Sequence, residues 1–104
     1  MKFIKMNGLG NDFVIFDSRA QEIALNPDQI RRIANRTTGV GCDQVLVISA
    51  HDASDAAMTV HNADGSTGAA MLCANGLRCV AHYLCEDLGR DSITVFHAGA
   101  VRAC

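Results

Sequence analysis

The sequence predicts an α+β domain in which mostly antiparallel strands wrap around a central helix. Short apolar runs, such as residues 14–16 and 44–48, are bounded by turn-forming residues and indicate strands. Residues 77–88 repeat apolar side chains at helical spacing and predict a helix that is buried on most sides. Since no motif occurs twice and no linker interrupts the chain, we expect residues 1–104 to form one domain.

The first elements are two strands around a tight loop. Residues 2–6 and the apolar run of residues 14–16 are expected to form the strands. The segment Asn7–Asp12 between them is rich in glycine and asparagine, which favours a turn.

A helix is expected next, because its N-terminal signals are complete. Asn26 stands where it can cap a helix that begins at Pro27, and Gln29 stands where the capping-box partner would be. Leu25 can pack on Ile30 as a hydrophobic staple. The sequence therefore fixes the start of this helix better than its end.

Two further strands lie in the middle of the chain. The first helix should end near Gly39, and a loop through Gly41 leads to a strand at residues 44–48. Another strand is expected at residues 58–62, followed by the turn-rich segment Asn62–Gly65.

The central helix follows that turn. Its apolar positions are Leu77, Val80, Ala81, Leu84 and Leu88. Gly89 is a natural terminator, and residues 93–96 are expected to form the last strand before Cys104.

Composition excludes several classes of protein. About half of the 104 residues are apolar, 19% are charged, and the net charge is −2 with scattered basic residues, so we expect neither disorder nor nucleic-acid binding. The N-terminus lacks a signal peptide and no segment is long enough to span a bilayer. A cytoplasmic location is expected, where the five cysteines would stay reduced.

Cys73 is the first candidate for chemistry, because the segment Cys73–Cys79 places a thiol at the start of the central helix. The unpaired N–H groups and the positive end of the helix dipole stabilise a thiolate, which can act as a base or a nucleophile. The same N–H groups can bind a carboxylate and stabilise developing enolate charge. An inert, buried cysteine remains the alternative from position alone.

Other chemistries fit less well. Cys79 and Cys85 lie on the apolar helix and are expected to pack, and with His82 they lack the spacing of a zinc site, so no metal is expected. The loop at Gly8–Asp12 lacks the dinucleotide-binding spacing. The two lysines lie in the predicted first strand, which leaves no Schiff-base lysine for pyridoxal phosphate, so no cofactor is expected.

Four segments, in this order, resemble the diaminopimelate epimerase family. They are Lys5–Phe13, Gly39–Gln44, Asn62–Gly65 and Cys73–Cys79. The resemblance covers nearly the whole chain. It implies one half of a pseudo-symmetric two-domain fold, in which two cysteines, one from each half, face each other across a cleft.

The resemblance also implies a mechanism and a set of residues. Cys73 matches the N-terminal catalytic thiol of a cofactor-independent isomerase that interconverts LL- and meso-diaminopimelate in lysine biosynthesis. One thiolate removes the α-proton and the other thiol donates a proton to the opposite face. The matching substrate-binding positions are Asn11, Gln44 and Asn62 through their side chains, and Ala74, Asn75 and Gly76 through the helix start.

Three positions depart from the family pattern: Ala74 replaces a glycine, Asn7 a histidine and Cys42 a phenylalanine. The segment from Gly65 to Cys73 is also slightly longer than the family norm. Only one copy of the cysteine motif is present, so we expect the chain to need a second domain and to be inactive alone, with a homodimer suggested by the family. The alternatives are a related amino-acid racemase, a non-catalytic binding domain and, third, a metal or redox module.

Overall fold

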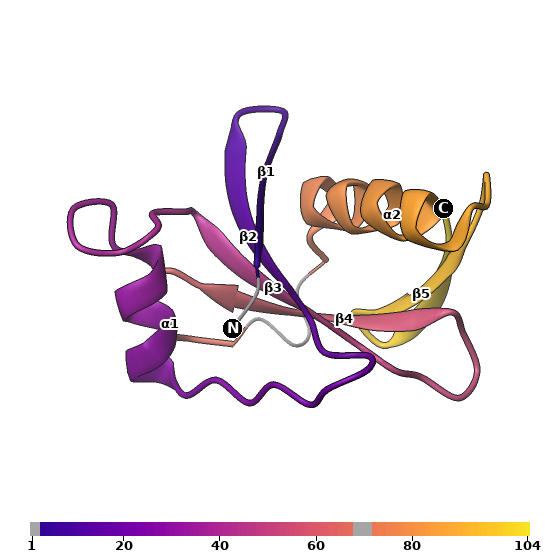
Figure 1. The fold of residues 1–104 in the computed structure, drawn as a ribbon, viewed down its shortest axis with the longest axis horizontal. Coiled ribbons are helices and arrows are strands. Elements are labelled where there is room, and N and C mark those ends of the chain that lie inside the picture. Colours follow the sequence, from indigo (N-terminus) through magenta and orange to yellow (C-terminus); the bar gives the residue numbers. More distant parts are fainter. Residues whose placement is uncertain (1–2, 68–71) are drawn as a thin grey trace.

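The computed structural model describes residues 3–67 and 72–104, which form one six-stranded sheet and two helices (Figure 1). The strands are β1 (Ile4–Gly8), β2 (Asn11–Asp17), β3 (Gln44–Ser49), β4 (Ala56–Asn62), β5 (Thr94–His97) and β6 (Ala100–Ala103). The helices are α1 (Pro27–Ala34) and α2 (Ala74–Leu88). The predicted α+β class is confirmed.

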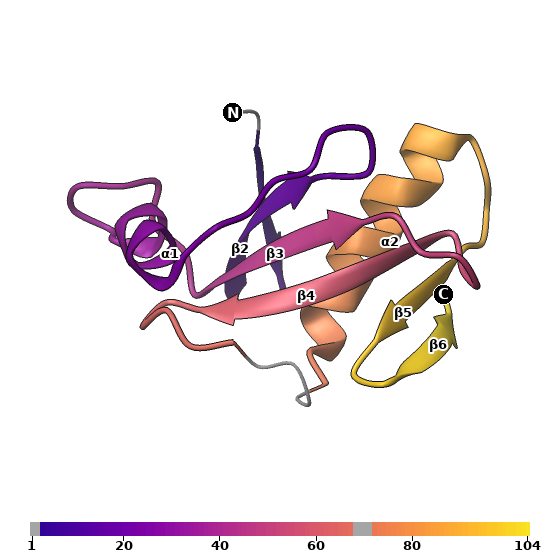
Figure 2. The same ribbon diagram turned by 90° about the horizontal axis from the view of Figure 1, so that it is seen from below.

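The sheet order equals the chain order, β1-β2-β3-β4-β5-β6 (Figure 2). Three pairs, β1–β2, β3–β4 and β5–β6, are antiparallel, whereas β2–β3 and β4–β5 are parallel. Each parallel pair is joined through a helix, as parallel strands require. Because β2 and β4 run in opposite directions, crossovers of the same hand place their helices on opposite faces of the sheet.

The sheet separates two apolar clusters. In β2, Phe13 and Ile15 face α2, whereas Val14 and Phe16 face Ile30 of α1. These four side chains of β2 are all buried, since both faces of the strand are covered there. The larger cluster lies between the sheet and α2.

Helix α1 begins as predicted. The Asn26 side chain accepts a hydrogen bond from the N–H of Gln29, and the Gln29 side chain accepts one from the N–H of Asn26. The helix ends at Ala34, earlier than the expected end near Gly39. The reason is Asn35, whose side-chain oxygen accepts hydrogen bonds from two following backbone N–H groups and so favours a turn over another helical turn.

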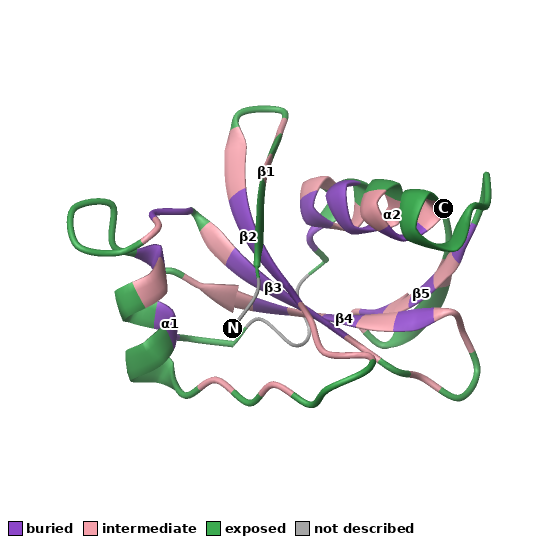
Figure 3. Ribbon diagram, in the orientation of Figure 1, coloured by how far each residue is buried: buried purple, intermediate pink, exposed green. Residues whose placement is uncertain are grey.

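Helix α2 spans the whole predicted region, with Cys73 as its N-cap and Gly89 in the left-handed conformation at its C-cap. The prediction that it is buried on most sides is wrong for the described residues. Only one side is buried, while Ala74, Arg78, His82 and the last turn are exposed (Figure 3). The sheet covers one flank of α2, and the other flank has no described element against it.

Strand β6 is not in the sequence prediction. It pairs with β5 through a tight turn at Ala98 and Gly99, which have φ angles of 51° and 79°. Three of its four residues, Ala100, Val101 and Ala103, are exposed, and the strand lacks apolar alternation, so the sequence carries no strand signal there. In the described part of the chain no helix is long and apolar enough to cross a membrane.

Candidate active site

The N-terminus of α2 presents backbone donors beside a thiol. Cys73 precedes the helix with φ −111° and ψ 86°, and its carbonyl accepts the first helical hydrogen bond from the N–H of Leu77 at 2.9 Å. The N–H groups of Ala74, Asn75 and Gly76 therefore have no acceptor within the helix. They form the positive helix end that the sequence predicts next to Cys73.

The Cys73 thiol is connected to two side chains of the sheet. Its Sγ–H donates to Oε1 of Gln44 at 3.3 Å, and Nε2 of Gln44 donates to Oδ1 of Asn62 at 3.1 Å. Nδ2 of Asn62 in turn donates to the hydroxyl oxygen of Ser66 at 3.1 Å. Gln44 and Asn62 are register partners on β3 and β4, so the sheet itself places the two amides side by side.

Strand alternation puts the three predicted amide residues on one face. Asn11, Gln44 and Asn62 each stand two positions from a core residue that packs on α2; these core residues are Phe13, Leu46 and Val60. The structure thus brings Gln44, Asn62 and Cys73 into one hydrogen-bonded group. Asn11 lies on the same face but makes no side-chain hydrogen bond to this group among the described residues.

Gly76 lets the sulfur lie close to the first turn of α2. A Cβ at this position would stand 2.9 Å from Sγ of Cys73 and 3.1 Å from Cδ1 of Leu46. Ala74, the departure from the family glycine, is exposed at the first helical position. Ala74 lines a hollow of about 500 Å³ between α2 and β6.

His97 is a site residue that the sequence analysis did not identify. It is 3% exposed, its Nε2 accepts the N–H of Cys73 at 3.0 Å, and its Nδ1 lies 3.3 Å from the carbonyl oxygen of Met58. Burial lowers the pKa of His97, so the neutral ring is favoured. The only sequence signal was a histidine two residues after Val95, on the buried side of β5.

An ion-pair cluster fixes the end of the β1–β2 hairpin near Asn11. Arg36 bridges Asp12 and Asp43 at 2.9 and 3.0 Å, and the N–H of Asp12 donates to the Asp43 carboxylate at 2.8 Å. The hydrogen bond from Asn7, followed by that from Arg36, lowers the pKa of Asp12. Asn7, a departure from the family histidine, therefore has a structural partner.

The remaining cysteines lie outside the hydrogen-bonded group. Cys79 is buried and Cys85 packs against the same core, as the sequence predicts. Cys42, another departure, is buried in the α1 cluster, where burial raises the pKa of its thiol. Within residues 3–67 and 72–104, no three His, Cys, Asp or Glu side chains are grouped to hold a metal ion. The longer segment between Gly65 and Cys73 lies partly outside the described residues.

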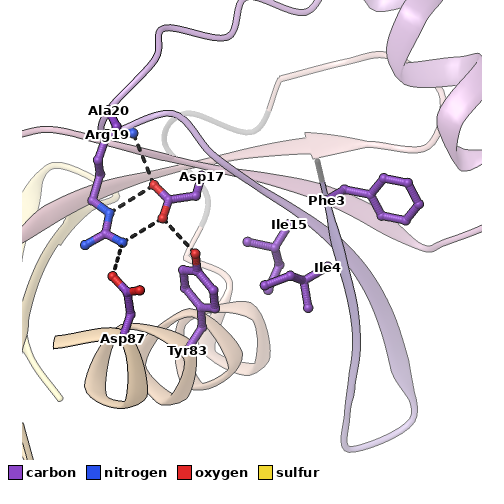
Figure 4. Close-up of a pocket in the computed structure, with 8 residues that line it drawn as sticks. All are labelled: Phe3, Ile4, Ile15, Asp17, Arg19, Ala20, Tyr83 and Asp87. Carbon is purple, nitrogen blue, oxygen red and sulfur yellow. Dashed lines mark hydrogen bonds and ion pairs between the residues drawn. The ribbon is translucent and has the colours of Figure 1, made fainter. Parts of the chain in front are cut away.

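A hollow of about 670 Å³ lies beside Tyr83 and Asp87, in the second half of α2 (Figure 4). The Tyr83 hydroxyl donates to Asp17 at 2.8 Å, and Arg19 pairs with both Asp17 and Asp87, at 2.6 and 2.7 Å. Cys73 is not among the lining residues. Because these polar groups satisfy one another, the cysteine at the start of α2 is a better candidate site than this larger hollow.

Comparison with solved structures gives the fold class. A phenazine biosynthesis protein of the PhzF family from Bacillus anthracis has a TM-score of 0.62 over 99% of this chain and 36% of its own length, at 20% sequence identity. At that identity the likeness shows the fold alone. The chain is thus an α+β domain of the fold seen in the PhzF protein, with a cysteine at the start of its central helix.

Sequence comparison gives the family. The family model described as diaminopimelate epimerase matches residues 3–103, so the chain belongs to the diaminopimelate epimerase family. A diaminopimelate epimerase from Rhodospirillum centenum is 43% identical over 99% of this chain and 35% of its own length. One from Nitrosospira multiformis is 48% identical over 81% of this chain and 30% of its own. The chain spans about a third of the length of these relatives.

Proposed function

We propose that this chain is the N-terminal domain of a cofactor-independent diaminopimelate epimerase and that Cys73 is one of its two catalytic bases. The observation that carries the proposal is the Cys73 thiol, which lies at the N-terminus of α2 and within hydrogen-bond distance of Gln44. Family membership supplies the reaction class, an isomerisation within lysine biosynthesis.

The proposed chemistry is a proton transfer at the substrate α-carbon. The carboxylate of LL-diaminopimelate binds the N–H groups of Ala74, Asn75 and Gly76, which stabilise the negative charge that develops when the α-proton leaves. The Cys73 thiolate takes that proton and becomes a thiol. A second thiol donates a proton to the opposite face and becomes a thiolate, so the stereocentre inverts and protons balance.

The amide side chains hold the rest of the substrate in this proposal. Gln44 and Asn62 lie beside the thiol, and Asn11 lies on the same face of the sheet. Amides both donate and accept, so they suit an amino-acid substrate that carries ammonium and carboxylate groups. Among the residues that the structure describes, no charged side chain hydrogen-bonds to Cys73.

The second thiol is expected on a second domain. The relatives are about three times as long as this chain, and the described residues contain one cysteine at a helix N-terminus. We therefore expect residues 1–104 alone to show no epimerisation, and we expect the enzyme that contains both domains to act as a homodimer in the cytoplasm.

The test is turnover. The chain with its coding frame read past Cys104 should interconvert LL- and meso-diaminopimelate, and Cys73→Ala should lower the rate by at least about a hundredfold. Cys104→Ala is the matched control, since its thiol is exposed and outside the site. Inversion by residues 1–104 alone, or an active Cys73→Ala variant, would contradict the proposal.

The same preparation separates two of the alternatives, a related amino-acid racemase and a non-catalytic binding domain. A racemase for another amino acid would invert proline or hydroxyproline and leave diaminopimelate unchanged. A non-catalytic binding domain would invert neither, and its Cys73 would react with iodoacetamide as slowly as a free thiol at neutral pH.

A further inference from the structure

The backbone of Cys73 is held by a side chain from a distant strand. The N–H of Cys73 donates to Nε2 of His97 at 3.0 Å, across 24 residues of sequence. Cys73 itself has no side-chain capping bond, because its Sγ–H points to Gln44 instead. A normal N-cap side chain accepts an N–H of the first helical turn. His97 instead accepts the N–H of the N-cap residue itself, as the N3 side chain does in a capping box.

His97 is in turn fixed from two directions. Its second nitrogen, Nδ1, lies 3.3 Å from the carbonyl oxygen of Met58 on β4, and Arg102 on β6 donates from Nε to the His97 carbonyl at 2.9 Å. Since Nε2 accepts, Nδ1 carries the proton and donates to Met58, which defines a neutral ring in one tautomer. With 3% exposure, the ring has little room to reorient.

The position of the thiol depends on the position of the Cys73 backbone, because Sγ is attached to it through Cβ alone. A displaced Cys73 backbone would move Sγ away from the N–H groups of the first turn and from Gln44. Thiolate stabilisation by a helix end falls off within one turn, so a small displacement weakens it.

We propose that His97 is a positioning residue that fixes the Cys73 backbone and thereby holds the thiol in its reactive place at the start of α2. This inference rests on the proposed role of Cys73. It assigns His97 no contact with substrate and no proton transfer.

Two variants separate positioning from simple core packing. His97→Gln places an amide oxygen where Nε2 lies and retains the acceptor. His97→Leu retains bulk and removes the acceptor. If His97→Leu does not fold by circular dichroism, His97→Asn takes its place, because its shorter side chain cannot reach the Cys73 N–H.

The first readout is the amide hydrogen exchange of Cys73 in the 104-residue chain, which reports the contact directly. We expect slow exchange in the wild type and in His97→Gln, and at least tenfold faster exchange in His97→Leu or His97→Asn. Equal exchange in all variants would overturn the inference, whatever Cys73 does chemically.

The second readout is the pH midpoint of iodoacetamide labelling at Cys73, resolved by peptide mass spectrometry with Cys104 as internal reference. Loss of the acceptor should move the midpoint upward by about half to one pH unit, which is about three- to tenfold less thiolate at a pH well below both midpoints. His97→Gln should stay within about twofold of the wild type. An unmoved midpoint in His97→Leu, or an equal shift in His97→Gln, would overturn the inference. If Cys73 of the wild type is labelled no faster than Cys104, that result counts against the proposed function instead.

Discussion

The Cys73 sulfur lies directly over Gly76, where a Cβ would stand only 2.9 Å from Sγ. This contact favours a residue without a Cβ at position 76, although glycine is a poor helix former. Leu46 closes the other side of the same space, since its Cδ1 would stand 3.1 Å from that Cβ. A methyl group at position 76 would therefore require the sulfur or the Leu46 methyl groups to move.

Gly76→Ala is therefore expected to destabilise the chain, although alanine is the better helix former. The intrinsic gain of about 1 kcal/mol is outweighed by overpacking, which costs about 1–3 kcal/mol in a buried position. Urea denaturation measures the net change in the free energy of unfolding. The control is Ala74→Gly, at an exposed position of the same helical turn. A more stable Gly76→Ala variant would show that Sγ moves aside without cost.

Asn26→Ala tests the capping box of α1. Removal of the Asn26 side chain leaves the N–H of Gln29 without its acceptor, so we expect a loss of about 1 kcal/mol of unfolding free energy. Gln21→Ala, in an exposed loop, is the control and should change stability by less than about 0.5 kcal/mol. Equal effects of the two substitutions would rule out a contribution from the cap.

The buried histidine predicts a pH dependence of stability. Burial lowers the pKa of folded His97 below its ordinary value of 6.5, so the unfolded chain binds more protons as the pH falls. Stability should be fully present above about pH 6.5 and decline below it, until the pH reaches the pKa of the folded state. Burial also lowers the pKa of His61, so His97→Gln should reduce this decline without abolishing it. Denaturation midpoints between pH 8 and pH 5 measure the difference.

The Asp12 carboxylate also predicts that the stability of the chain falls as the pH is lowered, in this case below pH 3.8. Hydrogen bonds from Asn7 and then Arg36 lower the pKa of Asp12 below 3.8, so its contribution is present above that pH and lost as the pH falls further. Asn7→Ala should raise the pKa of Asp12 toward 3.8, and Arg36→Gln should also raise it. Carboxyl carbon shifts in an NMR titration report both. An unchanged Asp12 titration in Asn7→Ala would contradict the assignment.

The sequence predicts local features of the fold well and distant contacts poorly. The capping box at Asn26 and the terminator Gly89 are short-range signals, and both occur as predicted. The end of α1 was misplaced because Asn35 satisfies two N–H groups that could otherwise extend the helix. Strand β6 was missed because pairing with β5, and not its own composition, makes it a strand.

The candidate site shows the same division. The position of Cys73 at a helix start is predicted from the sequence pattern, and the resemblance to the family supplies Gln44 and Asn62. In the structure Gln44 hydrogen-bonds to the thiol, and Asn62 hydrogen-bonds to Gln44. His97 carries no such signal. Its role depends on a hydrogen bond across 24 residues, which exists only once β5 has paired with β4.

The strand order has a consequence for how the chain assembles. Because every strand pairs with the strand made just before it, the sheet can grow from β1 outward in the order of synthesis, and no strand must wait for a distant partner. The thiol position is completed late in that order, since Gln44 and Asn62 are placed by β3 and β4 while His97 arrives only with β5. The hydrogen bond between the Cys73 N–H and His97 can therefore form only after β5 has been made, so His97 is the last of these side chains to become available to Cys73.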